Sequence, residues 1–246
     1  MIMEIIVPLG LFRAALASVK PHAATDKKDE RGRSIVITAT GAQVLVTASS
    51  GLTSALALVP LEEQDLTGEL SRFTFSPEAC KNVIDFFSLD KNDPDQQLEI
   101  TVRTTEEKKP GEQKPMKVAT VTLRRLGQLF GGDQLRLTEP IQERDVQGLW
   151  GTISRAARRA EETIRPVNIP ADRFNLFRSA QTVYNRAIAV TSDGPATGGL
   201  LVYCGEFFTG WMAVDRVDHD DASTRAHQRR QQFWASALPV NMIHAV

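Results

Sequence analysis

Cysteine is scarce in this 246-residue sequence, and long apolar runs are missing. No segment approaches the roughly 18 apolar residues of a membrane-spanning helix, and residues 1–11 lack the basic start and cleavage site of a signal peptide. Cys80 and Cys204 fall in a predicted helix and a predicted strand, which favours reduced, buried thiols over a disulfide. These features predict a cytoplasmic protein with no membrane partner.

The motifs of the common enzyme classes are also absent. The chain has no glycine-rich phosphate loop, no HExxH zinc motif, no CxxC pair and no GxSxG nucleophile motif. The acidic run at 215–221, with Asp218, His219 and Asp220, offers metal ligands but lacks the glycine and the spacing of a calcium loop. We therefore expect no catalysis, no metal and no other cofactor.

The basic residues change in kind along the chain. Residues 1–140 carry 17 basic and 19 acidic side chains, whereas residues 141–246 carry 12 basic and 11 acidic ones, and all 12 of these basic residues are arginine. Arginine stays charged and binds phosphate bidentately, so this composition is typical of a nucleic-acid contact. A solvated helix face with i,i+4 ion pairs explains the same composition. Charge alone leaves both interpretations open.

A strand, a proline and a helix follow one another at two places. In the first copy, residues 70–87, a short alternating strand precedes Ser76 at an N-cap position and Pro77 at the first helical position. In the second copy, residues 167–183, an extended run precedes Pro170 and apolar residues at helical spacing. Two β-like runs follow each copy, at 97–103 and 116–124 and at 187–192 and 199–214. This repetition predicts a duplicated α+β fold with helices packed on one face of antiparallel sheets.

The remaining patterns divide the chain near residue 140, where the hydrophobic period changes from two to 3.6. We predict a first unit at 1–140, a truncated second unit at 141–222, and a C-terminal helix and tail at 223–246. The other expected elements are strands at 3–7, 34–39, 43–48, 53–60 and 134–138, helices at 9–19, 144–165 and 223–237, and an acidic connector at 61–69.

This order of elements resembles one domain of the bacterial DNA polymerase sliding clamp, the beta-clamp family of processivity factors. Residues 12–20, 34–49 and 72–87 carry the resemblance, and residues 169–180 look like the back half of another such domain. The second copy has no counterpart of the three strands at 34–60. The resemblance therefore implies a divergent, phage- or plasmid-like clamp with about one and a half domains.

The resemblance also implies a function. It predicts a non-enzymatic processivity factor that encircles or contacts duplex DNA without reading its sequence and tethers a polymerase or another replication protein. It implies a homo-oligomer, and a trimer if a closed ring needs about six units and each chain supplies two. The alternative is a clamp-like interaction module that forms no ring and binds replication or repair proteins without DNA.

Contact with any duplex sequence calls for small and basic residues on helices, because phosphates rather than base edges must be met. Basic residues occur on all four helices predicted up to residue 183, whereas the densest acidic cluster falls in the connector at 61–69. A single exposed lysine or arginine is more often an ordinary solvated residue. The prediction therefore rests on the presence of basic residues on all four helices. The predicted DNA-binding residues, expected on one continuous face, are Arg13, Lys20, Lys81, Arg155, Arg158, Arg159 and Arg178.

Overall fold

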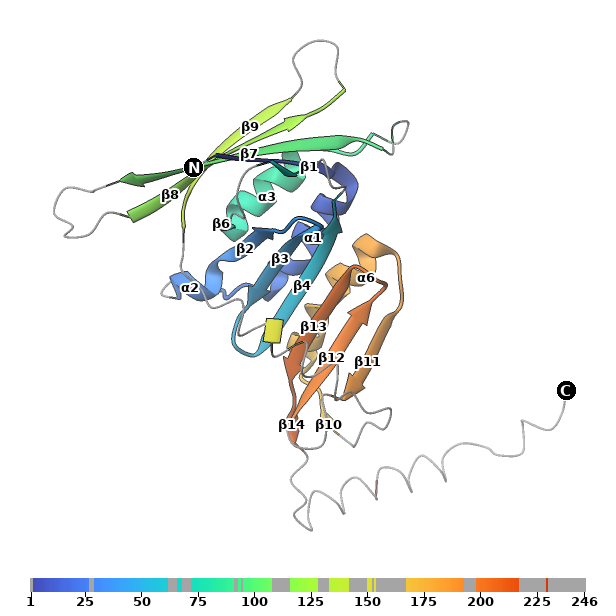
Figure 1. The fold of residues 1–246 in the computed structure, drawn as a ribbon. Coiled ribbons are helices and arrows are strands. Elements are labelled where there is room, and N and C mark those ends of the chain that lie inside the picture. Colours follow the sequence, from blue (N-terminus) through green and yellow to red (C-terminus); the bar gives the residue numbers. More distant parts are fainter. Residues whose placement is uncertain are drawn as a thin grey trace, which may run out of the picture.

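Two large antiparallel sheets and a layer of helices make up the protein (Figure 1). The computed structural model describes residues 2–26, 29–61, 66–67, 72–90, 93, 95–107, 116–127, 133–141, 150–151, 153, 167–192, 198–216 and 229. Most of the helix predicted at 144–165 and nearly all of the one at 223–237 lie outside these residues. Within the described part, no helix has both the length and the hydropathy of a membrane-spanning segment.

The first sheet has five strands, in the order β5 (Leu66–Thr67), β1 (Ile2–Pro8), β7 (Gln97–Glu107), β8 (Met116–Arg125) and β9 (Gln134–Pro140). Successive side chains of a strand point to opposite faces, so the apolar residues of β1, β7 and β8 cover one face and form part of the core. The segment at 61–69, predicted as an acidic connector, also contains a strand, because β5 lies within it and pairs with β1.

The second sheet has seven strands and joins both parts of the chain. Its order is β11 (Ile188–Ser192), β12 (Gly199–Cys204), β13 (Phe208–Ala213), β4 (Thr53–Pro60), β3 (Gln43–Ser49), β2 (Ile35–Ala39) and β6 (Arg72–Phe75). β4 and β13 pair antiparallel, with Ala57 opposite Phe208. The seven-stranded sheet therefore contains strands from both sides of the boundary predicted near residue 140, and the boundary itself stays a prediction.

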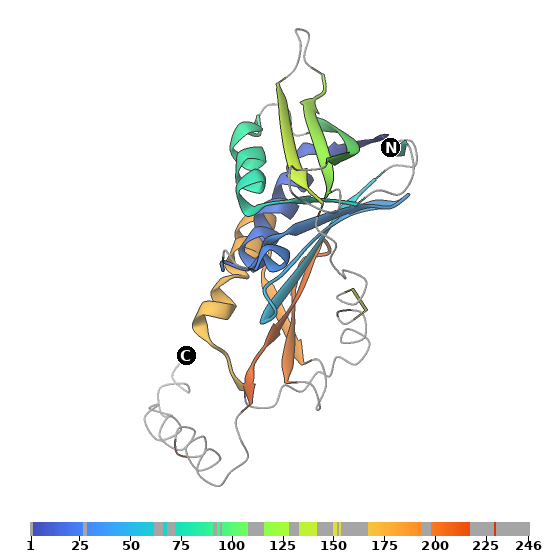
Figure 2. The same ribbon diagram turned by 90° about the vertical axis from the view of Figure 1, so that its left-hand side faces the viewer.

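The helices cover one side of the sheets, as Figure 2 shows. α1 (Leu9–Val19) has the predicted bounds and lies between α3 (Pro77–Phe86) and α6 (Arg178–Tyr184), with the short helix η1 (Lys20–His22) at its end. Ser76 caps α3, because its hydroxyl accepts a hydrogen bond from the Ala79 amide at 3.1 Å. The prediction of helices packed on antiparallel sheets in an α+β fold is therefore confirmed.

The second copy differs from its prediction in two places. Its helix is interrupted into α5 (Ala171–Asn175) and α6, and of its expected apolar stripe Phe177 and Ala180 are buried whereas Phe174 is exposed. The run at 199–214 is a hairpin of β12 and β13 rather than one strand, and Gly205 adopts a positive φ of 62° in its turn. Glycine tolerates that conformation because it has no Cβ.

Two short elements complete the fold. α2 (Glu30–Arg33) lies between η1 and β2, where the sequence pattern predicts no helix or strand. β10 (Val167–Asn168) pairs with β14 (Asp215–Arg216), so the acidic run at 215–221 begins in a strand.

The two parts of the chain share a buried aromatic cluster. His22 from η1 packs against Phe177 with ring centroids 4.5 Å apart and ring planes tilted by 59°, and the Phe208 ring lies 6.2 Å from both. Gly210 on β13 makes room for this cluster, because a Cβ there would lie 2.5 Å from the Phe177 ring and 2.8 Å from the Ser54 carbonyl oxygen. Core packing thus joins the first part of the chain to the strands that follow residue 188.

Candidate nucleic-acid interface

The helix layer formed by α1, η1, α3, α5 and α6 is the candidate DNA-facing surface. It carries five basic side chains, Arg13, Lys20, Lys81, Arg173 and Arg178, against three acidic ones, Glu78, Asp85 and Asp172. The residues of α1 that are not buried are mostly small or basic, as a surface that approaches phosphates requires. Four of the seven predicted DNA-binding residues lie on this layer: Arg13, Lys20, Lys81 and Arg178.

A shallow depression of about 240 Å³ lies in the middle of the layer. Gly10, Ala14 and Ala17 of α1 form its floor together with Arg13. Its rim is apolar and includes Ile84, Leu89 and Val183, of which Leu89 is 49% exposed and Val183 37% exposed. The apolar rim was not part of the prediction, because Leu89 and Val183 meet only through the packing of α1 against its neighbouring helices.

Arg13 holds two helices together. Its Nε and Nη2 atoms donate hydrogen bonds of 3.2 and 2.9 Å to the carbonyl oxygen of Ile84. That oxygen belongs to the last turn of α3, where carbonyl groups lack intrahelical partners. Partial burial and the neighbouring Arg125 charge lower the pKa of Arg13, yet an arginine stays protonated under any physiological condition. Arg13 is therefore a structural link that keeps its charge and its remaining donors near the depression.

Lys81 has a partner of opposite charge. Its Nζ lies 2.6 Å from Oδ2 of Asp85, one helical turn further along α3, and both side chains are exposed. The hydrogen bond with Asp85 raises the pKa of Lys81, and the same bond lowers the pKa of Asp85. Lys81 is therefore less available to a phosphate than its exposure suggests, because an acidic group competes for it.

Lys20 and Arg178 differ in their setting. Lys20 is half-buried at the start of η1, whereas Arg178 is exposed at the first position of α6. No ion pair formed by either appears among the described residues. Among the four described candidates, only Lys81 has an ion-pair partner in the described part of the protein, so Lys20, Arg178 and Arg13 keep unneutralised charges there.

Arg155, Arg158 and Arg159 lie outside the described residues, so their expected place on the same face stays a prediction. Trp150, Gly151 and Ile153, which precede them, are described. The Trp150 Nε1 atom donates a hydrogen bond of 3.1 Å to Thr47, and Ile153 is buried against Leu201. Thr47 and Leu201 alternate along β3 and β12 with residues that face the helices, so Trp150 and Ile153 contact the opposite face of the seven-stranded sheet.

The buried titratable groups take no part in this surface. Cys80 and Cys204 are buried free thiols, as the sequence predicts, and burial raises the pKa of each. The described part of the chain has no cluster of three or more histidine, cysteine, aspartate or glutamate residues that would hold a metal ion.

Comparison with known proteins defines the fold. No protein-family model matches the sequence, and no curated protein matches it. The solved beta subunit of DNA polymerase III from Thermotoga maritima matches 90% of this chain and 67% of its own, with a TM-score of 0.57 at 11% identity. The C. crescentus beta sliding clamp matches 91% of this chain and 67% of its own, with a TM-score of 0.54 at 8% identity. A DNA polymerase sliding clamp from Pseudomonas aeruginosa matches 90% of this chain and 67% of its own, with a TM-score of 0.52 at 12% identity.

The chain is thus an α+β protein with the sliding-clamp fold. Its structural counterparts are bacterial DNA polymerase III beta subunits, from which its sequence has diverged strongly, and it spans about two thirds of their length. The predicted resemblance is confirmed at the level of the fold.

Proposed function

We propose that this chain is a non-enzymatic, clamp-like processivity factor that contacts duplex DNA without reading its sequence and tethers a polymerase or another replication protein. The observation that supports this proposal most directly is the helix layer. This layer carries five basic against three acidic side chains on one side of the sheets, and α1 contributes small unburied residues to it. The clamp fold supports the same conclusion independently of charge.

The expected mode of binding follows from the residues on the layer. In this proposal Lys20 and Arg178 meet phosphates, and Arg13 on α1 contributes further charge. Binding by a few such contacts is weak and depends steeply on salt, because each neutralised phosphate releases counterions. A protein held in this way is able to move along the duplex, since no contact identifies a base.

A salt series with two unrelated duplexes tests this proposal. Replacing Lys20 and Arg178 with alanine should weaken binding to both duplexes equally and reduce the slope of log affinity against log salt by up to about two units, near one for each lost contact. Arg124→Ala is the matched control, because Arg124 lies on the outer face of the five-stranded sheet, away from the helices. An unchanged slope, or a loss confined to one duplex, would contradict the proposal.

The same salt series tests whether Arg155, Arg158 and Arg159 belong to the DNA-facing surface. Replacement of Arg155, Arg158 and Arg159 with alanine should lower the slope by up to about three units if these side chains contact phosphate. Folding should change little, because exposed substitutions usually fall within about half a kcal/mol. A wild-type slope would remove all three from the DNA-facing surface and leave the described helix layer as the whole of it.

We further propose that the chain assembles through its sheet edges into a homo-oligomer, with a trimer favoured. β11 and β6 end the seven-stranded sheet, and β5 and β9 end the five-stranded one. An unpaired sheet edge tends to recruit another strand, and a closed ring removes it. Sedimentation at tens of micromolar protein should show a species of three chains, whereas a monomer throughout would argue against a ring.

A second candidate function is a clamp-like interaction module that binds other replication or repair proteins without DNA. The apolar rim of the depression on the helix layer favours it, because exposed Leu89 and Val183 suit a protein contact better than a phosphate contact. Gel filtration with nicked circular DNA separates the two functions. A closed oligomer retained on the circle supports the clamp, and a monomer indifferent to DNA supports the module.

A further inference from the structure

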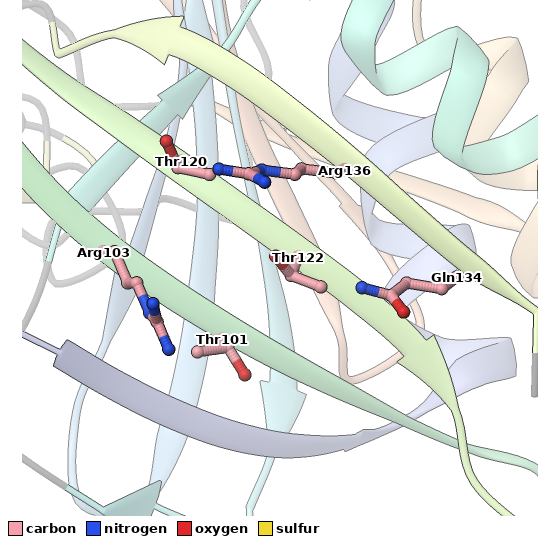
Figure 3. Close-up of a pocket in the computed structure, with 6 residues that line it drawn as sticks. All are labelled: Thr101, Arg103, Thr120, Thr122, Gln134 and Arg136. Carbon is pink, nitrogen blue, oxygen red and sulfur yellow. The ribbon is translucent and has the colours of Figure 1, made fainter. Parts of the chain in front are cut away.

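The outer face of the five-stranded sheet carries a polar pocket of about 260 Å³. Two arginines, three threonines and a glutamine line it: Thr101, Arg103, Thr120, Thr122, Gln134 and Arg136. Figure 3 shows these side chains on three neighbouring strands, with Arg136 reaching over β8 towards Thr120 and Arg103 beside Thr101. The pocket lies on the face opposite the core and the helix layer, because the alternate residues of the same strands are buried.

The strand register brings the six side chains together. Arg103 of β7 lies opposite Thr120 of β8, and the next outward pair is Thr101 and Thr122. Thr122 in turn lies opposite Arg136 of β9. Side chains directly opposite each other on one face of a sheet have Cβ atoms roughly 5 Å apart, so one small ligand is able to reach all three strands. This grouping cannot be predicted from the sequence, because it depends on the pairing of three separated segments.

Both arginines keep an unneutralised charge. The ion pairs among the described residues join Lys81 to Asp85, Arg124 to Glu99 and Arg125 to Asp133, and none of them includes Arg103 or Arg136. The contrast with Arg124 is direct, because Arg124 is on the same face of β8 and gives Nε and Nη2 to the two carboxylate oxygens of Glu99 at 3.0 and 3.1 Å. Two free guanidinium groups beside hydroxyl and amide donors form a cationic site rich in hydrogen-bond donors.

We propose that this pocket binds the phosphate or diphosphate group of a small phosphorylated molecule. Arginine forks match phosphate oxygens, and the threonine hydroxyls and the Gln134 amide supply further donors. The lining has no aromatic ring on which a base would stack and no apolar side chain that would anchor a peptide. Its volume lies just below the range of pockets for drug-sized ligands, so the pocket has room for a small phosphorylated group. This site is independent of the proposed DNA-facing surface.

Calorimetric titration of the 246-residue chain with inorganic phosphate and with pyrophosphate, at constant ionic strength, tests the site. Arg103→Gln and Arg136→Gln should each weaken binding about tenfold, as expected for the loss of one charge-assisted contact, and the double variant should abolish it. Thr122→Val keeps the strand and the shape but removes a hydroxyl, and it should weaken binding by a smaller factor. Glu4→Gln should strengthen binding, because Glu4 lies opposite Thr101 on β1 and opposes an anion there.

The matched control removes a neighbouring arginine without touching the site. The double variant Glu99→Gln with Arg124→Gln deletes the ion pair on the same face and leaves the net charge unchanged. It should bind phosphate as the wild type does. Equal binding by the wild type and the Arg103 and Arg136 variants, an equal loss in the control, or chloride binding as strong as phosphate binding would overturn the proposal. A loss of duplex DNA affinity in the same two variants would assign this face to nucleic acid instead and would overturn it as well.

Discussion

His22 should make the protein sensitive to mild acid. The imidazole is fully buried between Phe177 and Phe208, and neither of its nitrogens has a hydrogen-bond partner among the described residues. Burial disfavours the charged imidazolium and lowers the pKa of His22 from 6.5 to about 3. The folded protein therefore keeps this side chain neutral at pH values at which the unfolded chain protonates it.

The direction and size of the effect follow from the two pKa values. Above pH 6.5 the imidazole is neutral in both states and contributes no pH dependence. Below pH 6.5 His22 is protonated in the unfolded state but stays neutral in the folded state. The free energy of unfolding therefore falls by up to about 1.4 kcal/mol for each pH unit until the pH nears 3. At pH 5 the loss from this one group amounts to about 2 kcal/mol, a large share of the stability of an ordinary domain.

Urea unfolding at pH 7.5 and pH 5 isolates this contribution. His22→Leu replaces the ring with an apolar side chain of similar volume that does not titrate. The wild type should lose about 2 kcal/mol more than this variant between the two pH values, whatever constant offset the substitution introduces. If the variant does not fold, an NMR titration of the wild type should show the His22 imidazole unprotonated at pH 5. An identical pH dependence in both proteins, or a titration near pH 6.5, would refute the reasoning.

Three further substitutions test other parts of the structure. Gly210→Ala should destabilise the protein by about 1–3 kcal/mol in urea unfolding, because the new methyl group would collide with the Phe177 ring and a backbone carbonyl. An unfolding midpoint equal to that of the wild type would show that the aromatic cluster rearranges without cost. Ser76→Ala should cost about 1 kcal/mol through the lost cap of α3, measured in the same way, and a change near zero would mean that water replaces the hydroxyl. Asp85→Asn releases Lys81 and should tighten duplex binding with a salt slope steeper by about one unit, whereas an unchanged slope would exclude Lys81 from the DNA-facing surface.

The sequence by itself determined the local elements. The predicted bounds of α1 and β4 agree with the structure, because the apolar period and the flanking prolines act within a few residues. Ser76 and Pro77 mark the start of α3 for the same reason, since a cap and a first helical position need only their immediate neighbours. The order of these elements was enough to indicate the clamp fold.

Tertiary structure decided everything that depends on distant residues coming together. The pairing of β4 with β13 sets the continuity of the seven-stranded sheet, and no local pattern in either strand specifies its partner. Arg13 appears on the sequence as a free surface charge, yet α3 brings the Ile84 carbonyl within hydrogen-bonding distance of it.

Two further features could not be predicted from the sequence, because they too depend on contacts between distant segments. His22 follows a proline at the end of a helix and gives no sign of burial in the sequence, but Phe177 and Phe208 enclose it from segments more than 150 residues away. The pocket on the outer face joins Arg103 to Arg136 only through the register of three strands. Hydrophobic period fixes which face of an element is buried, whereas the partner across the core or the sheet is fixed by packing alone.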